Sequence, residues 1–408
     1  MKKRICFLVG SISISGGTYV IFQHASYLQD NGYDVTLAVQ EAFTEETSSW
    51  HDCGKKLRCI PFDQARGETY DLVIATWWKT ALELAGFSAP RYGYFVQSIE
   101  SRFYPESEVP LRALVDSTYR LPVSYITEAK WIGQHLKLLF GQNATLVRNG
   151  IRKDIYTEVG PTIAARSAER PRVLIEGHFN VAFKNTALAL RLAKKAGAKD
   201  IWVLTGSPIE SIPGVSRVFS RVLISKTPEI YRSCDILVKL STVEGMFGPP
   251  LEMFHCGGTA IVFDVTGHDE YIEDQVNAIV VKDKNTKKVV SELRQIISDT
   301  AYMEMLKKGA KETANSWPDW AHSSSLFAEW TKETLAAEET NRQEVEEIVK
   351  KAWEVYAVDE KERLIDDPWI ERKYKMAAYV RSLPPGGKNM LKKVISLKEI
   401  FFSSDKVS

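Results

Sequence analysis

The apolar positions of the chain recur in short runs rich in β-branched residues, separated by stretches with helical spacing. The first runs are "RICFLVG", "DVTLAVQ", "DLVIAT" and "YGYFVQS", and the helical pattern of residues 19–31 follows the first of them. Strands that alternate with helices along a chain form parallel βαβ units. The pattern therefore predicts an α/β fold whose first domain is Rossmann-like.

The same pattern starts again at "PRVLIEG". It continues with a helical stretch at 185–197, the runs "DIWVLTG", "SRVFS" and "DILVKLS", a helix near 251–256, and "TAIVFDV". Residues 159–171 lack an apolar period and carry Pro and Ser, which is typical of a linker. We therefore expect a Rossmann-like N-terminal domain at 1–160 and a Rossmann-like C-terminal domain at 171–316, with a ligand-binding cleft between them.

The C-terminal part of the chain differs in charge. We expect a helix at 317–337 that returns to the N-terminal domain and a helical, charged extension at 338–408, acid-rich to residue 367 and basic from residue 371. "LPPGG" at 383–387 breaks any helix, and the segment after it has the pattern of a basic amphipathic helix. Such a helix either lies on an anionic membrane surface or, more commonly, docks on its own protein.

Composition narrows the class of protein. The 408 residues are 44% hydrophobic with a formal net charge of +1, so no global field attracts nucleic acid. Five scattered cysteines without metal-finger spacing indicate reduced thiols and no structural metal. The N-terminal apolar run is too short for a signal peptide, and no run reaches the roughly 20 residues that span a bilayer. We expect a cytoplasmic protein, peripheral at the inner face of the membrane if the basic helix binds lipid.

The stretch "VEGMFGPPLE", residues 243–252, sets two carboxylates around a rigid turn. Proline is favoured in the first helical turn, so we expect Glu252 in that turn and Glu244 in the loop before it. A carboxylate can accept hydrogen bonds from two adjacent sugar hydroxyls, and loop N–H groups can bind phosphate. The loop thus suits a nucleotide-sugar, although Glu252 could instead only stabilise the helix dipole. The N–H groups expected to face phosphate are those of Met246, Phe247 and Gly248.

Glycine-rich turns follow three predicted strands. Gly16, Gly17 and Thr18 open the first helix, where N–H groups can receive an anion or a sugar hydroxyl. Gly177 and Lys184 lie in "EGHFNVAFKN" before a helix of the second domain, where a cation can meet phosphate, and Gly206 lies in "TGSP". Tight turns and a solvated lysine are the alternatives.

With these turns and the acidic loop together, the chain resembles the retaining glycosyltransferases of family four over residues 4–335. The motif that carries the resemblance is Glu244 to Glu252 with Gly245, Phe247, Gly248, Pro250 and Gly257, and with Met246 as one additional residue. The resemblance implies a two-Rossmann (GT-B) fold, a nucleotide-sugar donor in the C-terminal domain, an acceptor in the N-terminal domain, and no metal. It also implies that Glu252 binds the ribose, Glu244 the donor sugar and Lys184 the diphosphate, and that Gly17 borders diphosphate and acceptor.

The chain departs from this family at two places. Where the family commonly has Arg shortly before its phosphate lysine, this chain has His178 and Asn180. Where many members have a His in the first domain, it has Gln97, which we expect to contact the donor sugar. The stretch "YFVQSIESRFYP" is similar to a branch with bacterial rhamnosyltransferases and contributes Glu100, a candidate for the acceptor side or for a structural loop.

The sequence therefore predicts a metal-independent, retaining glycosyltransferase that acts on a glycan or lipid-linked glycan acceptor in bacterial surface polysaccharide biosynthesis. Two alternatives stay open. One is a nucleotide-sugar epimerase of the same fold, which would need acids or histidines to move a proton. The other is a catalytically silent subunit that binds a nucleotide-sugar.

Overall fold

The computed structural model describes residues 2–366 and, beyond them, isolated positions between 372 and 395. The chain divides into two compact units. The first unit combines the chain up to Gly150 with the segment that starts at Pro318, and the second runs from Ile151 to Trp317. The basic helix expected after "LPPGG" falls almost entirely outside the described residues.

The first unit is built on a seven-stranded parallel sheet with strand order β3-β2-β1-β4-β5-β6-β7. Its strands are β1 (Arg4–Val9), β2 (Asp34–Val39), β3 (Arg58–Pro61), β4 (Leu72–Ala75), β5 (Tyr92–Val96), β6 (Ser124–Thr127) and β7 (Ala144–Leu146). The helices between them are α1 (Gly16–Asp30), α2 (Phe62–Arg66), α3 (Trp78–Ala81), α4 (Val109–Ser117) and α5 (Lys130–Phe140). Because the central strands are buried on both faces, they appear in the sequence as continuous apolar runs.

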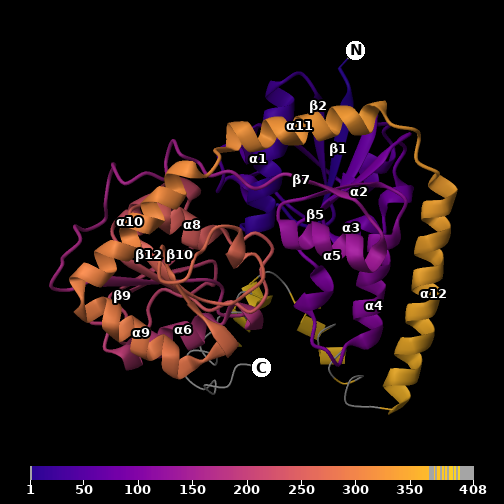
Figure 1. The fold of residues 1–408 in the computed structure, drawn as a ribbon. Helices are drawn as coiled ribbons and strands as arrows, with labels where there is room; N and C mark the ends of the chain where they lie inside the picture. Colours follow the sequence, from indigo (N-terminus) through magenta and orange to yellow (C-terminus); the bar gives the residue numbers. More distant parts are fainter. Residues whose placement is uncertain are drawn as a thin grey trace. The chain divides into compact units, whose positions relative to one another are not determined.

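Two helices from the C-terminal part of the chain complete the first unit. α11 (Trp320–Ala336) packs on α1, where the Phe327 ring stacks on His24 at 4.3 Å between ring centroids. α12 (Arg342–Asp366) lies alongside α4 (Figure 1), and Arg363 forms an ion pair of 2.7 Å with Glu108. The described part of the charged extension is therefore an integral layer of the first unit.

The second unit has a six-stranded parallel sheet with strand order β10-β9-β8-β11-β12-β13. Its strands are β8 (Arg172–Glu176), β9 (Asp200–Thr205), β10 (Arg217–Ser220), β11 (Ile236–Lys239), β12 (Thr259–Phe263) and β13 (Ile279–Val281). Its helices are α6 (Thr186–Ala196), α7 (Thr227–Arg232), α8 (Gly248–His255), α9 (Thr286–Ser298) and α10 (Thr300–Ser316). Both predicted Rossmann-like series are thus present, which confirms the α/β fold class.

The segment predicted to be the linker is not free. It belongs to the second unit, which begins at Ile151 and not near residue 171. The Arg232 guanidinium donates to the Pro161 carbonyl at 2.9 Å, and the Ser233 hydroxyl accepts from the N–H groups of Ile163 and Ala164 at 2.9 and 3.2 Å. The boundary prediction was wrong because a polar segment without apolar period can still pack when side chains satisfy its backbone groups.

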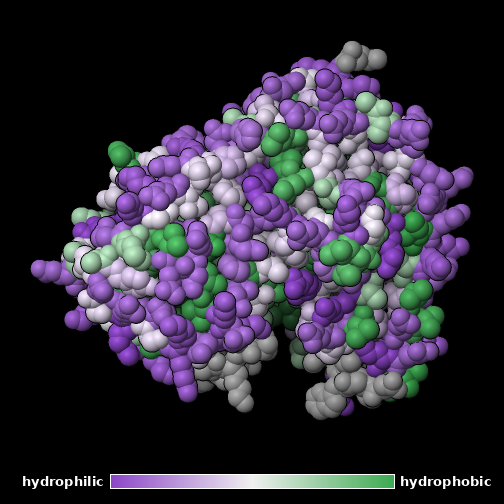
Figure 2. Space-filling view, in the orientation of Figure 1, coloured by the Kyte–Doolittle hydropathy of each residue, from purple (hydrophilic) through white to green (hydrophobic). Residues whose placement is uncertain are grey.

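Three further observations concern the surface, the helices and the cysteines. In the view of Figure 2, hydrophilic residues dominate and hydrophobic residues form small separate clusters. Among the residues that the structure describes, no helix is both long enough and apolar enough to cross a membrane. All five cysteines are free thiols.

Candidate functional site

The carboxyl ends of β8 and β11 bring charged residues together in the second unit. β8 ends at Glu176 and β11 at Lys239, and the pairing of Ile175 with Val238 makes these two end residues neighbours. The Lys239 ammonium donates to the Glu176 carboxylate. In an open parallel sheet, ligands bind beyond the carboxyl ends of the strands, so this edge is the candidate site.

Lys184 and Glu244, both predicted from the sequence, meet at this edge. Lys184 ends a short 3-10 helix before α6 and donates to both carboxylate oxygens of Glu244, at 2.8 and 2.7 Å, across 60 positions of sequence. Their side chains are 24% and 9% exposed. Burial opposes ionisation of Glu244, but the charges of Lys184 and Lys239 outweigh it and hold its pKa below the usual value.

Glu252 lies behind this pair on α8. The helix begins at Gly248 with its prolines in the first turn, as predicted, but Glu252 is its fifth residue and lies in the second turn. The dipole effect falls off within the first turn, so capping does not explain Glu252. Burial and the nearby Glu176 raise the pKa of Glu252 to about 7, although Tyr231, Lys239 and Tyr156 act to lower it. This carboxyl titrates near neutral pH.

The loop predicted to bind phosphate packs into the second unit and forms hydrogen bonds within its own turn. The side chains of Met246 and Phe247 are buried in the core of the second unit. The N–H of Gly248 donates to the Met246 carbonyl at 3.1 Å, and the Tyr271 hydroxyl donates to the Phe247 carbonyl. The Gly248 N–H is thus already bonded within the turn, and phosphate binding by the N–H groups of this loop stays a prediction.

The two glycine turns of the second unit are required by close packing. Gly177 has φ +143°, and a Cβ atom there would lie 2.5 Å from the Thr186 hydroxyl oxygen. A Cβ atom at Gly206 would lie 2.1 Å from the His178 ring. These turns therefore let the His178 loop approach the end of β9 and the start of α6.

In the first unit, the predicted residues gather at the carboxyl ends of β1 and β5. α1 begins at Gly16, and a Cβ atom at Gly17 would lie 3.2 Å from the Gln97 amide oxygen. Gln97 also donates to the Thr76 carbonyl at 3.4 Å. The Thr18 hydroxyl donates to the Ser11 carbonyl at 3.1 Å, so Thr18 stabilises the turn.

Glu100 does not line a surface. Its residue is 6% exposed, and its carboxylate accepts hydrogen bonds from the Trp78 N–H at 2.7 Å and the Tyr94 hydroxyl at 3.4 Å. Burial raises its pKa to about 8. The acceptor-side prediction for Glu100 was wrong, and the structural alternative fits, because this carboxyl satisfies buried donors of the first unit.

The sequence reasoning missed Lys239, Glu176, Tyr231 and Tyr156. Lys239 had a visible signal, since it is a charged residue inside the apolar run "DILVKLS". A lysine is almost never fully buried unless it is paired. Its presence in a buried strand therefore indicates a partner carboxylate, which the sequence does not identify.

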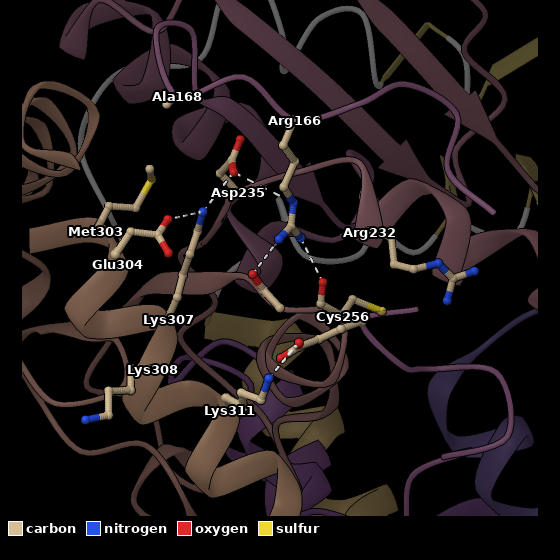
Figure 3. Close-up of a pocket in the computed structure, with 12 residues that line it drawn as sticks. Arg166, Ala168, Arg232, Asp235, Cys256, Met303, Glu304, Lys307, Lys308 and Lys311 are labelled. Atoms are coloured by element: carbon tan, nitrogen blue, oxygen red, sulfur yellow. Dashed lines mark hydrogen bonds and ion pairs between the residues drawn. The ribbon is translucent and has the colours of Figure 1, made fainter. Parts of the chain in front are cut away.

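A cavity lies at the end of the second sheet opposite to the candidate site, beside Asp235, which precedes β11. Figure 3 shows the residues that line it. It has a volume of about 660 Å³, and Lys307 bridges Asp235 and Glu304 there at 2.9 and 3.0 Å. Lys311 pairs with Glu158 at 2.8 Å, and Arg166 donates to the carbonyls that end α8. These contacts connect the segment that opens the second unit to α10 and to the end of α8, so we assign the cavity a structural role.

The comparisons with known proteins agree with this architecture. Residues 217–313 match the family model described as glycosyl transferases group 1. A chitobiosyldiphosphodolichol beta-mannosyltransferase of Candida albicans is 28% identical over 108 residues, 24% of this chain and 24% of that protein. The match thus spans about a quarter of the relative's length.

Solved structures show the same fold at low identity. A sucrose-phosphate synthase of Thermosynechococcus elongatus has a TM-score of 0.65 at 14% identity, covering 82% of this chain and all of the other. HepE of Anabaena, in complex with UDP and glucose, has a TM-score of 0.64 at 14% identity over 81% of this chain and 100% of that one. WaaG, a glycosyltransferase involved in lipopolysaccharide biosynthesis, has a TM-score of 0.60 at 12% identity over 80% and 98% of the two chains. Residues 217–313 of the second unit thus resemble glycosyl transferases group 1, and the chain has the two-Rossmann GT-B fold.

Proposed function

We propose that this chain is a glycosyltransferase that moves a sugar from a nucleotide-sugar, held by the second unit, to a glycan acceptor held by the first. The observation that carries the proposal is the Lys184–Glu244 pair with Glu252 behind it, at the carboxyl edge of the second sheet. One cation and two acids at this edge match the diphosphate, the donor sugar and the ribose of such a donor.

The pair also suggests how the donor is received. An arriving diphosphate takes over the Lys184 ammonium, which frees Glu244 to accept hydrogen bonds from sugar hydroxyls, and Glu252 accepts those of the ribose. As the bond from the anomeric carbon to the diphosphate oxygen breaks, an acceptor hydroxyl oxygen bonds to that carbon and its proton passes to the leaving diphosphate. Lys184 stabilises the negative charge that grows on the leaving oxygen. HepE, whose structure contains UDP and glucose, supports a nucleotide-sugar as the ligand class.

Three finer features belong to the proposal. The sugar is transferred with retention of configuration, as the family resemblance implies. No metal is needed, because Lys184 supplies the charge at the diphosphate. The acceptor is a glycan or lipid-linked glycan of a bacterial surface polysaccharide. It binds near Gly16, Gly17 and Gln97 of the first unit, and the reaction takes place in the cytoplasm. The likeness to WaaG, which is involved in lipopolysaccharide biosynthesis, supports that pathway class.

Calorimetry with UDP, GDP, dTDP and ADP, followed by their sugars, tests the proposal. We expect one nucleotide to bind and Lys184→Met to weaken its binding by about tenfold to a hundredfold, the range of one or two lost charge-assisted hydrogen bonds. Lys226→Met is the matched control, because Lys226 pairs with Glu229 on the surface of the same unit. Absence of nucleotide binding by the wild type, or unchanged binding by Lys184→Met, would overturn the assignment. Binding without transfer to any glycan would favour a silent subunit.

A further inference from the structure

A buried ion pair occupies the last layer of the second sheet. Leu174 and Leu237 pair in register and belong to the apolar cluster that packs under α8. Side chains alternate between the faces of a strand, so the residues two positions later, Glu176 and Lys239, point to the same face. The pair thus stands where an apolar pair would continue the core toward α8.

Stability does not explain this pair. The Lys239 side chain is only 2% exposed, and that of Glu176 is 22% exposed. Replacing a buried ion pair by apolar residues of similar volume is often neutral or stabilising, because desolvation of the charges offsets their attraction. The charges that surround Lys239 give a better account of its presence.

Lys239 lies among three carboxylates from three elements. Its ammonium interacts electrostatically with Glu176 on β8, with Glu244 in the loop after β11, and with Glu252 on α8. Together with Lys184, these groups comprise two ammonium groups and three carboxylates in their ionised forms. The anionic diphosphate of a donor must enter this cluster, so each buried cation changes how the acids receive it.

We infer that Lys239, held by Glu176, is a positioning residue of the donor site, which acts through Glu244 and Glu252 and sets the pH range in which the nucleotide binds. The inference rests on the proposed function. Lys239 favours the carboxylate form of Glu252, and Glu176 opposes it by like-charge repulsion. A carboxylate is needed to accept the ribose hydroxyls, so nucleotide affinity rises as Glu252 loses its proton.

Two variants should move the pH dependence in opposite directions. Lys239→Met, with Glu176 kept, removes the cation but not the repelling charge and should weaken nucleotide binding at pH 7 on the order of tenfold, the effect of one unit in the pKa of Glu252. Glu176→Gln removes the repelling charge and should move the midpoint of binding to lower pH. Lys239→Arg keeps the cation and should retain the wild-type midpoint. The groups that face Glu252 and enter this profile are Glu176, Lys239, Tyr231, Tyr156, Cys256 and Tyr271.

The experiment is calorimetric titration with UDP, GDP and ADP from pH 5.5 to 9, with a thermal melt of each variant at each pH. The control is Lys288→Met, which breaks a Lys–Glu pair on α9 of the same unit from the lysine side and should leave affinity unchanged. A wild type that binds no nucleotide at any pH would defeat the proposed function. A wild type that binds, with both test variants showing its affinity and midpoint, would defeat only this inference. If Lys239→Met does not fold, a binding midpoint of Glu176→Gln equal to that of the wild type still overturns the inference.

Discussion

Lys184→Met should cost the free protein more stability than Glu244→Gln, although the two residues form the same ion pair. The Glu244 side chain is 9% exposed and Lys184 is 24% exposed, so loss of the lysine leaves the more deeply buried charge behind. Breaking a buried pair from one side costs about 3–5 kcal/mol. Lys239 still compensates Glu244 in the variant, so we expect about 2 kcal/mol for Lys184→Met. Loss of Glu244 leaves a lysine that water can reach, so Glu244→Gln should lower the free energy of unfolding by only about 1 kcal/mol.

Urea denaturation of both single variants and the double variant measures this difference and the coupling between the residues, which should be about 1 kcal/mol. The pH dependence gives a second check. The pKa of Glu244 is lowered in the folded state, so its contribution is present above the pKa of the unfolded chain and is lost as pH falls through the folded value. The deficit of Glu244→Gln should therefore shrink in acid. A Lys184→Met cost equal to or below that of Glu244→Gln would refute the burial argument.

Three further predictions concern packing in the first unit, the protonation of His24 and the transfer reaction. Gly93→Ala should destabilise the first unit by about 1–3 kcal/mol in urea, since its Cβ would lie 2.7 Å from the Trp330 ring, whereas Gly133→Ala, 3.6 Å from its nearest neighbour, should be neutral or stabilising. Burial lowers the pKa of His24 to about 3, so its contribution is lost as pH falls below about 6.5, and His24→Phe should flatten this part of a melting-temperature profile. EDTA should leave sugar transfer unchanged, and proton NMR of the product should show the anomeric configuration of the donor; loss of activity with EDTA or inversion would contradict the proposed mechanism.

Much of the fold was predictable because its signals are local. Buried parallel strands must be apolar on both faces, so runs such as "DILVKLS" mark them directly, and the restart at "PRVLIEG" marks the second sheet. The glycine turns and the Pro-started α8 were equally readable, since backbone geometry restricts which residues can occupy them. The error in the unit boundary has the opposite cause, because packing of residues 159–170 depends on distant side chains such as Arg232.

The sequence by itself determined that two Rossmann-like series follow one another, that acids flank a rigid turn in the second, and that a lysine precedes its first helix. Only the tertiary structure decided that Lys184 contacts Glu244, that Glu100 is enclosed in the first unit, and that Lys239 lies among three acids. The physical reason is that strand register and burial fix these contacts. Spacing along the chain specifies which residues can approach one edge of a sheet, but desolvation and neighbouring charges, which set their ionisation, arise only when separate elements pack together.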